Sequence, residues 1–359
     1  MSLKTLVAQV RWNCQVASAG QAGLHSLCGT LLRLRQLYKW EHGLDPWQEP
    51  EPGLVLAWVE EQERTWESLE GFPLQKPAWD GDVFDPFAVA DLNGRLGSAG
   101  LAYGAGLCRG LAPTFFLGEL KEARQEKGLT ILVLGQELAR DLDGTPALCQ
   151  GDLIYGRQQT LAYYLWDRLS DPVMQQNHFL KVALSACGLE LRELLRRPGA
   201  CQKEFQTLVA AELNAVLAHE VGEALEPSLK ETLPAVLSRY PQSRLELFVR
   251  ALKDCLAEVN DWGRVSFTIR EEQLGSLALM LALRPGLYPL LLPELEPAFR
   301  ELCATGDWSA LDAARRRALA RLRQTAAPLE DLLLEIREEQ GFPDPLPEIQ
   351  RRYLAPLGL

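Results

Sequence analysis

The sequence predicts an all-α, multi-helix globular protein, with a minor β element near residues 129–134. Apolar residues recur at helical spacings of three, four and seven along most of the chain. Proline and glycine fall between these segments, where helices commonly begin and end. With 359 residues, of which 47% are hydrophobic, the chain is long enough to bury a sizeable core.

In the first part of the chain, periodicity predicts helices at 3–19, 21–40 and 54–70. The second of these carries an apolar stripe that includes Leu27, Leu31 and Leu34. The third places Trp58 and Trp66 eight residues apart on one side, which is typical of core tryptophans. These positions predict that the three helices pack together through one face of each.

A glycine-rich stretch at 93–118 contains seven glycines but no P-loop pattern. We interpret it as helices that pack closely through small residues. The apolar run at 129–134 has the length of a strand, although periodicity alone does not distinguish a short strand from a helix.

The second part of the chain reads as a long helical run. Helices are expected at 157–170, 228–239, 241–259, 270–283, 293–305, 308–323 and 327–340. A division near residue 150 therefore predicts an N-terminal helical region at 1–150 with the glycine-rich segment and a C-terminal helical region at 151–359. No internal repeat marks either region.

The best-defined helix covers residues 208–226, with Pro227 at its end. His219 and Glu223 are four apart and therefore stack one turn from each other, and Glu212 lies seven residues before His219 on nearly the same stripe. Glu220 projects from within the apolar face, where burial would raise its pKa toward that of a general base. Gly222 leaves one side of the helix bare, so a backbone or a ligand could approach closely.

The segment AHEVGEAL resembles the active-site helix of zinc metallopeptidases, whose signature is H-E-x-x-H. The resemblance implies His219 as a zinc ligand and Glu220 as the residue that activates water. Glu223 stands where the second histidine of that signature would be. Carboxylates also bind zinc, so a site of this kind would use His219, Glu223 and a third ligand such as Glu212 or His178.

The whole chain resembles an uncharacterised bacterial all-helical family without an assigned activity. The stretches that carry this resemblance are LCGTLLRLRQLYKWEHG near the start and PTFFLGEL in the middle. It implies no reaction.

Composition restricts the partners. The formal net charge of −11 and the pI of about 5.1 argue against a nucleic-acid-binding protein. No apolar run reaches the ~20 residues of a membrane span, so we expect no membrane partner and a cytoplasmic location.

The function itself stays unknown at this point, with three hypotheses open. The first is a helical scaffold that binds a protein partner in its grooves. The second is a metal-dependent hydrolase-like site on the 208–226 helix, with zinc as the metal. The third is a di-metal carboxylate oxidoreductase, in which Glu119, Glu137 and Glu212 would converge with His178 and His219.

Overall fold

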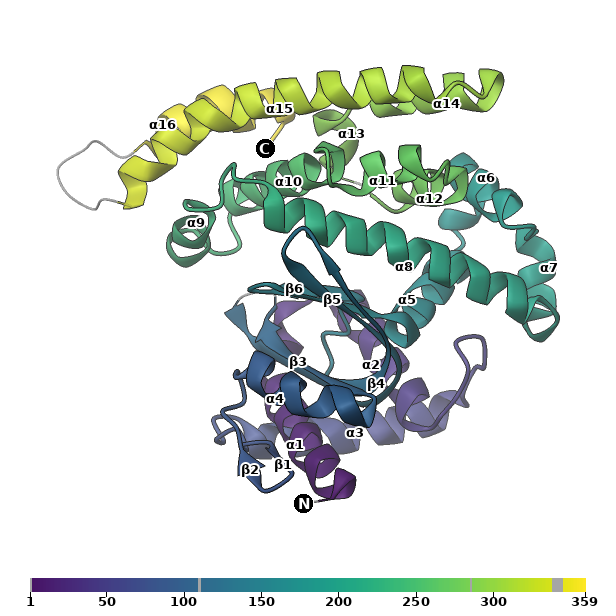
Figure 1. Cartoon of the computed structure of the whole chain (residues 1–359), viewed down its shortest axis with the longest axis vertical. Helices are drawn as coiled ribbons and strands as arrows, with labels where there is room; N and C mark the ends of the chain where they lie inside the picture. Colours follow the sequence, from purple (N-terminus) through teal and green to yellow (C-terminus); the bar gives the residue numbers. More distant parts are fainter. Residues whose placement is uncertain (1, 109–110, 285, 338–344) are drawn as a thin grey trace. The chain divides into compact units, whose positions relative to one another are not determined.

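The computed structural model describes residues 2–108, 111–284, 286–337 and 345–359. Its internal contacts divide the chain into two compact units, and each is described by itself (Figure 1). Unit 1 comprises Met1–Pro172 and Arg192–Leu213, and unit 2 comprises Val173–Leu191 and Asn214–Leu359. The predicted pair of domains, 1–150 and 151–359, stays a prediction.

The prediction of an all-α protein is wrong, because unit 1 contains a curled five-stranded sheet and the fold is mixed α/β (Figure 1). In spatial order the strands are β3 (Leu101–Leu107), β4 (Pro113–Glu126), β5 (Leu129–Arg140), β7 (Leu153–Arg157) and β6 (Ala147–Gln150). Neighbouring strands are antiparallel except β5 and β7, which run parallel.

Within the glycine-rich stretch, residues 93–96 end a helix, residues 101–107 form β3 and residues 113–118 begin β4, whereas we expected closely packed helices throughout. Residues 109 and 110 lie outside the described residues. A Cβ on Gly104 would lie 2.0 Å from Cζ of Phe116 on the paired strand. The glycine is therefore needed so that the Phe116 ring can lie over the backbone of β3. The strand expected at 129–134 is real and continues to Arg140 as β5.

Unit 1 also contains helices, and some of them pack on the sheet. Their bounds are α1 (Leu3–Gln21), α2 (Leu27–Glu41), α3 (Pro52–Leu69), α4 (Val89–Leu96), α5 (Gln158–Ser170) and α7 (Leu191–Arg196), and a two-stranded ribbon joins β1 (Ala78–Trp79) to β2 (Asp82–Val83). Helix α1 packs on β4 and β5, and α4 packs on β3. Trp58 and Trp66 are both buried in one cluster with α2, as their spacing predicted.

Buried charges lie at the end of β5. The Arg157 guanidinium is 2.5 Å from Glu137, and the Arg140 guanidinium is 3.8 Å from the same carboxylate. All three side chains are at most 1% exposed. Asp141 is fully buried next to them, where burial and then the charge of Asp143 raise its pKa. Because a buried charge is costly without partners, this network is tied to the folding of the sheet.

The described residues of unit 2 contain helices joined by turns and loops, and no strand. Its helices are α6 (His178–Ala186), α9 (Leu233–Arg239), α10 (Arg244–Val259), α11 (Arg264–Arg270), α12 (Leu274–Leu283), α13 (Tyr288–Leu291), α14 (Leu295–Thr305), α15 (Trp308–Arg337) and α16 (Leu346–Ile349). Helix α10 packs against α11, α13 and α15, and α6 packs against α12 (Figure 1). Residues 265–269, VSFTI, are rich in β-branched and aromatic residues, as strands often are, but they lie within α11.

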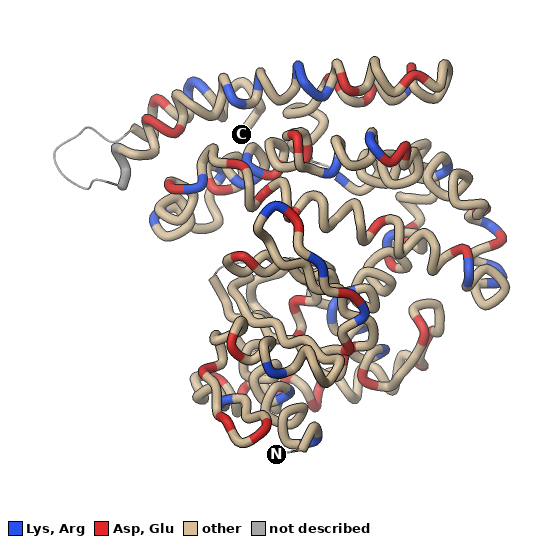
Figure 2. Tube along the Cα trace, viewed as in Figure 1, with Lys and Arg blue, Asp and Glu red and all other residues tan. Residues whose placement is uncertain are grey.

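Helix α8 (Gln202–Leu225) contributes its first part to unit 1 and residues 214–225 to unit 2. Among the described residues, none of the helices combines the length and the apolar character needed to traverse a bilayer. Both acidic and basic positions occur in each unit (Figure 2).

Candidate metal centre between helices α8 and α10

Helices α8 and α10 approach each other very closely at Gly222. A Cβ on this residue would lie 2.4 Å from the carbonyl oxygen of Ala257 and 2.8 Å from Cα of Gly263. The side-chain amide of Asn260 also donates a hydrogen bond of 2.8 Å to the carbonyl oxygen of Gly222. The bare side of α8 expected at Gly222 is thus filled by the backbone of the neighbouring segment.

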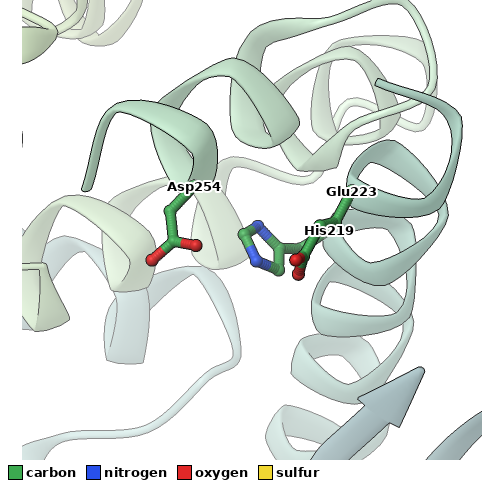
Figure 3. Close-up of side chains that lie close together, drawn as sticks. All are labelled: His219, Glu223 and Asp254. Atoms are coloured by element: carbon green, nitrogen blue, oxygen red, sulfur yellow. The ribbon is translucent and has the colours of Figure 1, made fainter. Parts of the chain in front are cut away.

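This close approach brings side chains of the two helices together. His219 and Glu223 on α8 face Asp254 on α10, and one potential ligand atom from each lies within 4.8 Å of the others (Figure 3). Within the part of the chain that the structure describes, this is the one group of three or more such residues with the geometry of a metal site. It contains one imidazole nitrogen donor and two carboxylate oxygen donors.

Glu258, one turn after Asp254, lies behind the imidazole. Its Oε1 atom is 3.3 Å from Nδ1 of His219 and 2.8 Å from a terminal nitrogen of Arg284, and its side chain is 0% exposed. Burial alone would raise the pKa of Glu258, but His219 and Arg284 outweigh it and lower the pKa to about 2. Burial likewise works against the charge of His219, yet Glu258 raises the pKa of this imidazole to about 9.

The two carboxylates of the group have partners of their own. Glu223 forms an ion pair with the Lys253 ammonium, which opposes burial and lowers the pKa of Glu223. The Tyr288 hydroxyl donates a hydrogen bond of 3.3 Å to Asp254 and accepts one of 2.9 Å from Arg284. Arg284 therefore contacts Glu258 of α10 directly and is connected to Asp254 of α10 through Tyr288.

Glu220 lies next to this group in sequence and interacts with its charges. Burial is the largest cause that raises its pKa to about 7, and the charges of Glu223 and Asp254 act in the same direction, whereas His219 opposes them. A carboxyl with a pKa near neutrality can accept a proton from water and release it again at physiological pH.

Two family models match this chain. A model described as a family of unknown function (DUF6866), N-terminal domain, matches residues 5–157, and the C-terminal domain model of the same family matches residues 162–351. The chain belongs to the DUF6866 family. Every residue of the candidate centre lies within the DUF6866 C-terminal domain. No curated protein and no solved structure matches the chain.

Two residues that the sequence suggested as further ligands lie outside the group in this DUF6866 protein. His178 is exposed at the first position of α6. Glu212 is 2% exposed in the part of α8 that belongs to unit 1. Glu119 and Glu137, considered for a di-metal centre, are also residues of unit 1, where Glu137 is paired with Arg157.

The sequence predicted a helix at 241–259, but sequence reasoning missed the contribution of this helix, α10, to the candidate centre. The signal was present at Glu258, which interrupts the apolar run of Cys255, Leu256, Ala257 and Val259. The same criterion singled out Glu220 on α8, because an acid within an apolar face needs a partner. Applied to α10, it would have selected Glu258 and, one turn earlier, Asp254.

Proposed function

We propose that the C-terminal domain binds one divalent metal ion through His219, Glu223 and Asp254, and that the protein is a metal-dependent hydrolase. The observation that carries the proposal is the convergence of these three donors from two helices to within 4.8 Å. Ligands of one zinc ion lie about 2.0–2.2 Å from it and hence no more than roughly 4.4 Å from each other. A small adjustment of the side chains would therefore complete the site.

The position of Glu258 supports metal binding by His219. A histidine that binds a metal commonly directs its other ring nitrogen to a carboxylate, which fixes the ring and strengthens it as a ligand. Glu258 lies 3.3 Å from Nδ1, so Nε2 is the nitrogen that would face the metal. One nitrogen and two oxygen donors suit zinc, and also manganese or ferrous iron.

The choice of a hydrolase follows from the residues around the three donors. Three protein ligands leave a coordination position for water, and a bound zinc ion lowers the pKa of that water to about 7. Glu220 directly follows His219, as the base does in the metallopeptidase signature, and we assign it the role of general base. Glu223 takes the place of the second histidine of that signature and Asp254 comes from another helix, so a peptidase substrate is not implied.

Zinc titration with a competing chelator tests the metal site. Wild-type protein purified without an affinity tag should bind about one zinc ion per chain, and His219→Ala should abolish this binding. His178→Ala is the matched control, because it removes an exposed histidine of the same domain and should leave binding unchanged. Equal zinc binding by His219→Ala, or none by the wild type, would overturn the metal site.

Turnover of p-nitrophenyl acetate with saturating zinc tests the chemistry separately. Glu220→Gln should keep the metal and lose hydrolysis, because the amide cannot accept the proton of the attacking water. Unchanged hydrolysis in this variant would remove Glu220 from the mechanism. A zinc-loaded wild type without any hydrolytic turnover would contradict the hydrolase assignment while leaving the metal site intact.

A further inference from the structure

A cavity of about 590 Å³ lies in unit 2, where the start of α10 meets the segment 346–359. Its walls come from the turn before α10, the first residues of α10, α16 and the helical turns at 350–357. Leu245, Leu346 and Leu354 contribute apolar surface. The volume falls within the range of roughly 300–1,000 Å³ that is typical of small-molecule sites, so the cavity can hold a compact organic molecule.

Two arginines of this cavity carry charges that the fold does not neutralise. Arg244 is the first residue of α10 and Arg351 comes two residues after α16, and both are exposed. Among the residues that the structure describes, neither guanidinium has a hydrogen-bond or ion-pair partner, and no acidic side chain lines the cavity. By contrast, Arg250 farther along α10 lies 2.7 Å from the carboxylate of Glu246. The charges of Arg244 and Arg351 are therefore available to a ligand.

The backbone on either side of the cavity is held by capping and packing. The Ser243 hydroxyl accepts a hydrogen bond of 3.1 Å from the first turn of α10 and donates one of 2.7 Å to the Tyr240 carbonyl, which fixes the helix start beside Arg244. On the other side, Tyr353 is buried, and its ring centroid lies 6.2 Å from that of Phe248 on α10. The two segments that carry the arginines are thus joined before a ligand arrives, which limits the conformational freedom lost on binding.

We infer that this cavity binds a phosphate monoester of a small apolar alcohol, with the phosphate at Arg244 and Arg351 and the organic group against the leucine side chains. A phosphate monoester carries a charge of about −1.5 to −2 at pH 7 and three acceptor oxygens, so one group can offset both guanidiniums. The planar guanidinium also matches the spacing of two phosphate oxygens. A carboxylate carries one negative charge and would leave one of the two positive charges without a partner.

Calorimetric titration of the full-length protein at pH 7.5 with phenyl phosphate tests this inference, and phenyl sulfate, phenol and inorganic phosphate serve as comparisons. Phenyl phosphate should bind with a stoichiometry near one. Phenyl sulfate has a similar shape but a single negative charge, phenol lacks the anion, and inorganic phosphate lacks the ring. Each of these three should bind at least about fivefold more weakly than phenyl phosphate.

The comparison compounds also show which part of the inference fails. Equal affinity for phenyl phosphate and phenyl sulfate would overturn the requirement for two charges. Equal affinity for phenyl phosphate and inorganic phosphate would overturn the role of the apolar walls. No binding of phenyl phosphate would overturn the inference as a whole.

Three variants locate the ligand. Arg244→Gln and Arg351→Gln should each weaken phenyl phosphate at least about tenfold, because each removes a charged donor. Neither arginine has a partner among the described residues, so both variants should unfold at the same temperature as the wild type. Arg352→Gln is the control, because Arg352 is an exposed neighbour that does not line the cavity, and binding should be unchanged. Unchanged binding in both Arg244→Gln and Arg351→Gln would contradict this location.

The inference does not depend on the proposed metal site, whose three ligands do not line this cavity. The titrations use protein that has been freed of metal with a chelator and then freed of the chelator, because a chelator anion could compete for the same guanidiniums. His219→Ala should bind phenyl phosphate as tightly as the wild type does. Loss of binding in His219→Ala, with Arg351→Gln unaffected, would place the ligand at the metal centre and overturn the inference.

Discussion

Gly222 and Ala257 hold α8 and α10 at a distance that no other residue type at position 222 would permit. A Cβ on Gly222 would lie 2.4 Å from the carbonyl oxygen of Ala257, closer than real Cβ atoms approach a backbone oxygen. His219 and Glu223 lie on either side of this glycine in sequence, and Asp254 and Glu258 lie on either side of Ala257. The contact of the two backbones is thus what places the four polar side chains opposite each other.

Gly222→Ala should consequently separate the helices and weaken zinc binding. Because the obstructing atom belongs to the backbone, the added methyl should lower the free energy of unfolding by about 1–3 kcal/mol. Gly20→Ala is the control, since Gly20 is a helical glycine of α1 with open space around its Cβ position. That change should raise stability by about 0.5–1 kcal/mol. Urea unfolding of both variants checks this, and equal effects would contradict the close-contact account.

Glu258→Gln should weaken zinc binding about 10- to 100-fold, the usual cost of losing the carboxylate behind a metal-binding histidine. It should also lower the free energy of unfolding by about 2–4 kcal/mol, because His219 and Arg284 both lose the negative charge of the Glu258 carboxylate. The partial exposure of Arg284 to water limits this loss of stability. Chelator-competition titration and urea unfolding measure the two effects. Glu301→Gln, an exposed residue of α14, is the control and should change neither.

Lys253→Met distinguishes a metal site from a plain network of ion pairs. The Lys253 ammonium pairs with Glu223 and would repel a divalent cation bound to the same carboxylate. Its removal should therefore tighten zinc binding by roughly three- to tenfold. If the cluster serves stability alone, the variant should be less stable and should still bind no zinc, which would contradict the proposed function.

The stability of unit 1 should depend on the titration of Asp141. Burial, followed by Asp143, raises the pKa of Asp141 in the folded state above its ordinary value of 3.8. A raised pKa means that this residue favours folding most at low pH and that the contribution is lost as the pH rises through the raised value. Asp141→Asn should therefore match the wild type below about pH 4 and gain stability relative to it at higher pH.

Urea unfolding between pH 3.5 and 8 checks this prediction, followed by a probe within unit 1 such as Trp66. Asp152→Asn, at an exposed position between β6 and β7, is the control. A stability difference between Asp141→Asn and wild type that did not vary with pH would show that the buried carboxylate does not change its protonation as proposed.

The helices could be predicted from the sequence because their apolar positions repeat at the helical period. The sheet could not, because β4 contains the segment ELKEARQE, which is composed almost entirely of good helix formers. In the structure this segment pairs with the first half of β5, and tertiary pairing overrides its local preference. Strand β3 could not be recognised in the sequence either. Small residues lie on both of its faces, so apolar and polar residues do not alternate along it.

The α8 half of the candidate centre could be predicted from the sequence, since His219 and Glu223 are four apart on one helix and face the same way. The α10 half could not be placed with it, because no local signal specifies which helix lies opposite. That pairing depends on the contact of Gly222 with Ala257, which joins residues 35 positions apart. The position of Arg284 near Glu258 arises in the same way, from packing between distant segments.

Crystals of the full-length protein, soaked in zinc and measured at the zinc absorption edge, would show whether a zinc ion binds between α8 and α10. We expect one anomalous peak per chain between His219, Glu223 and Asp254, with ligand distances of about 2.0–2.2 Å. No peak at this position, with Lys253 still paired to Glu223, would contradict it.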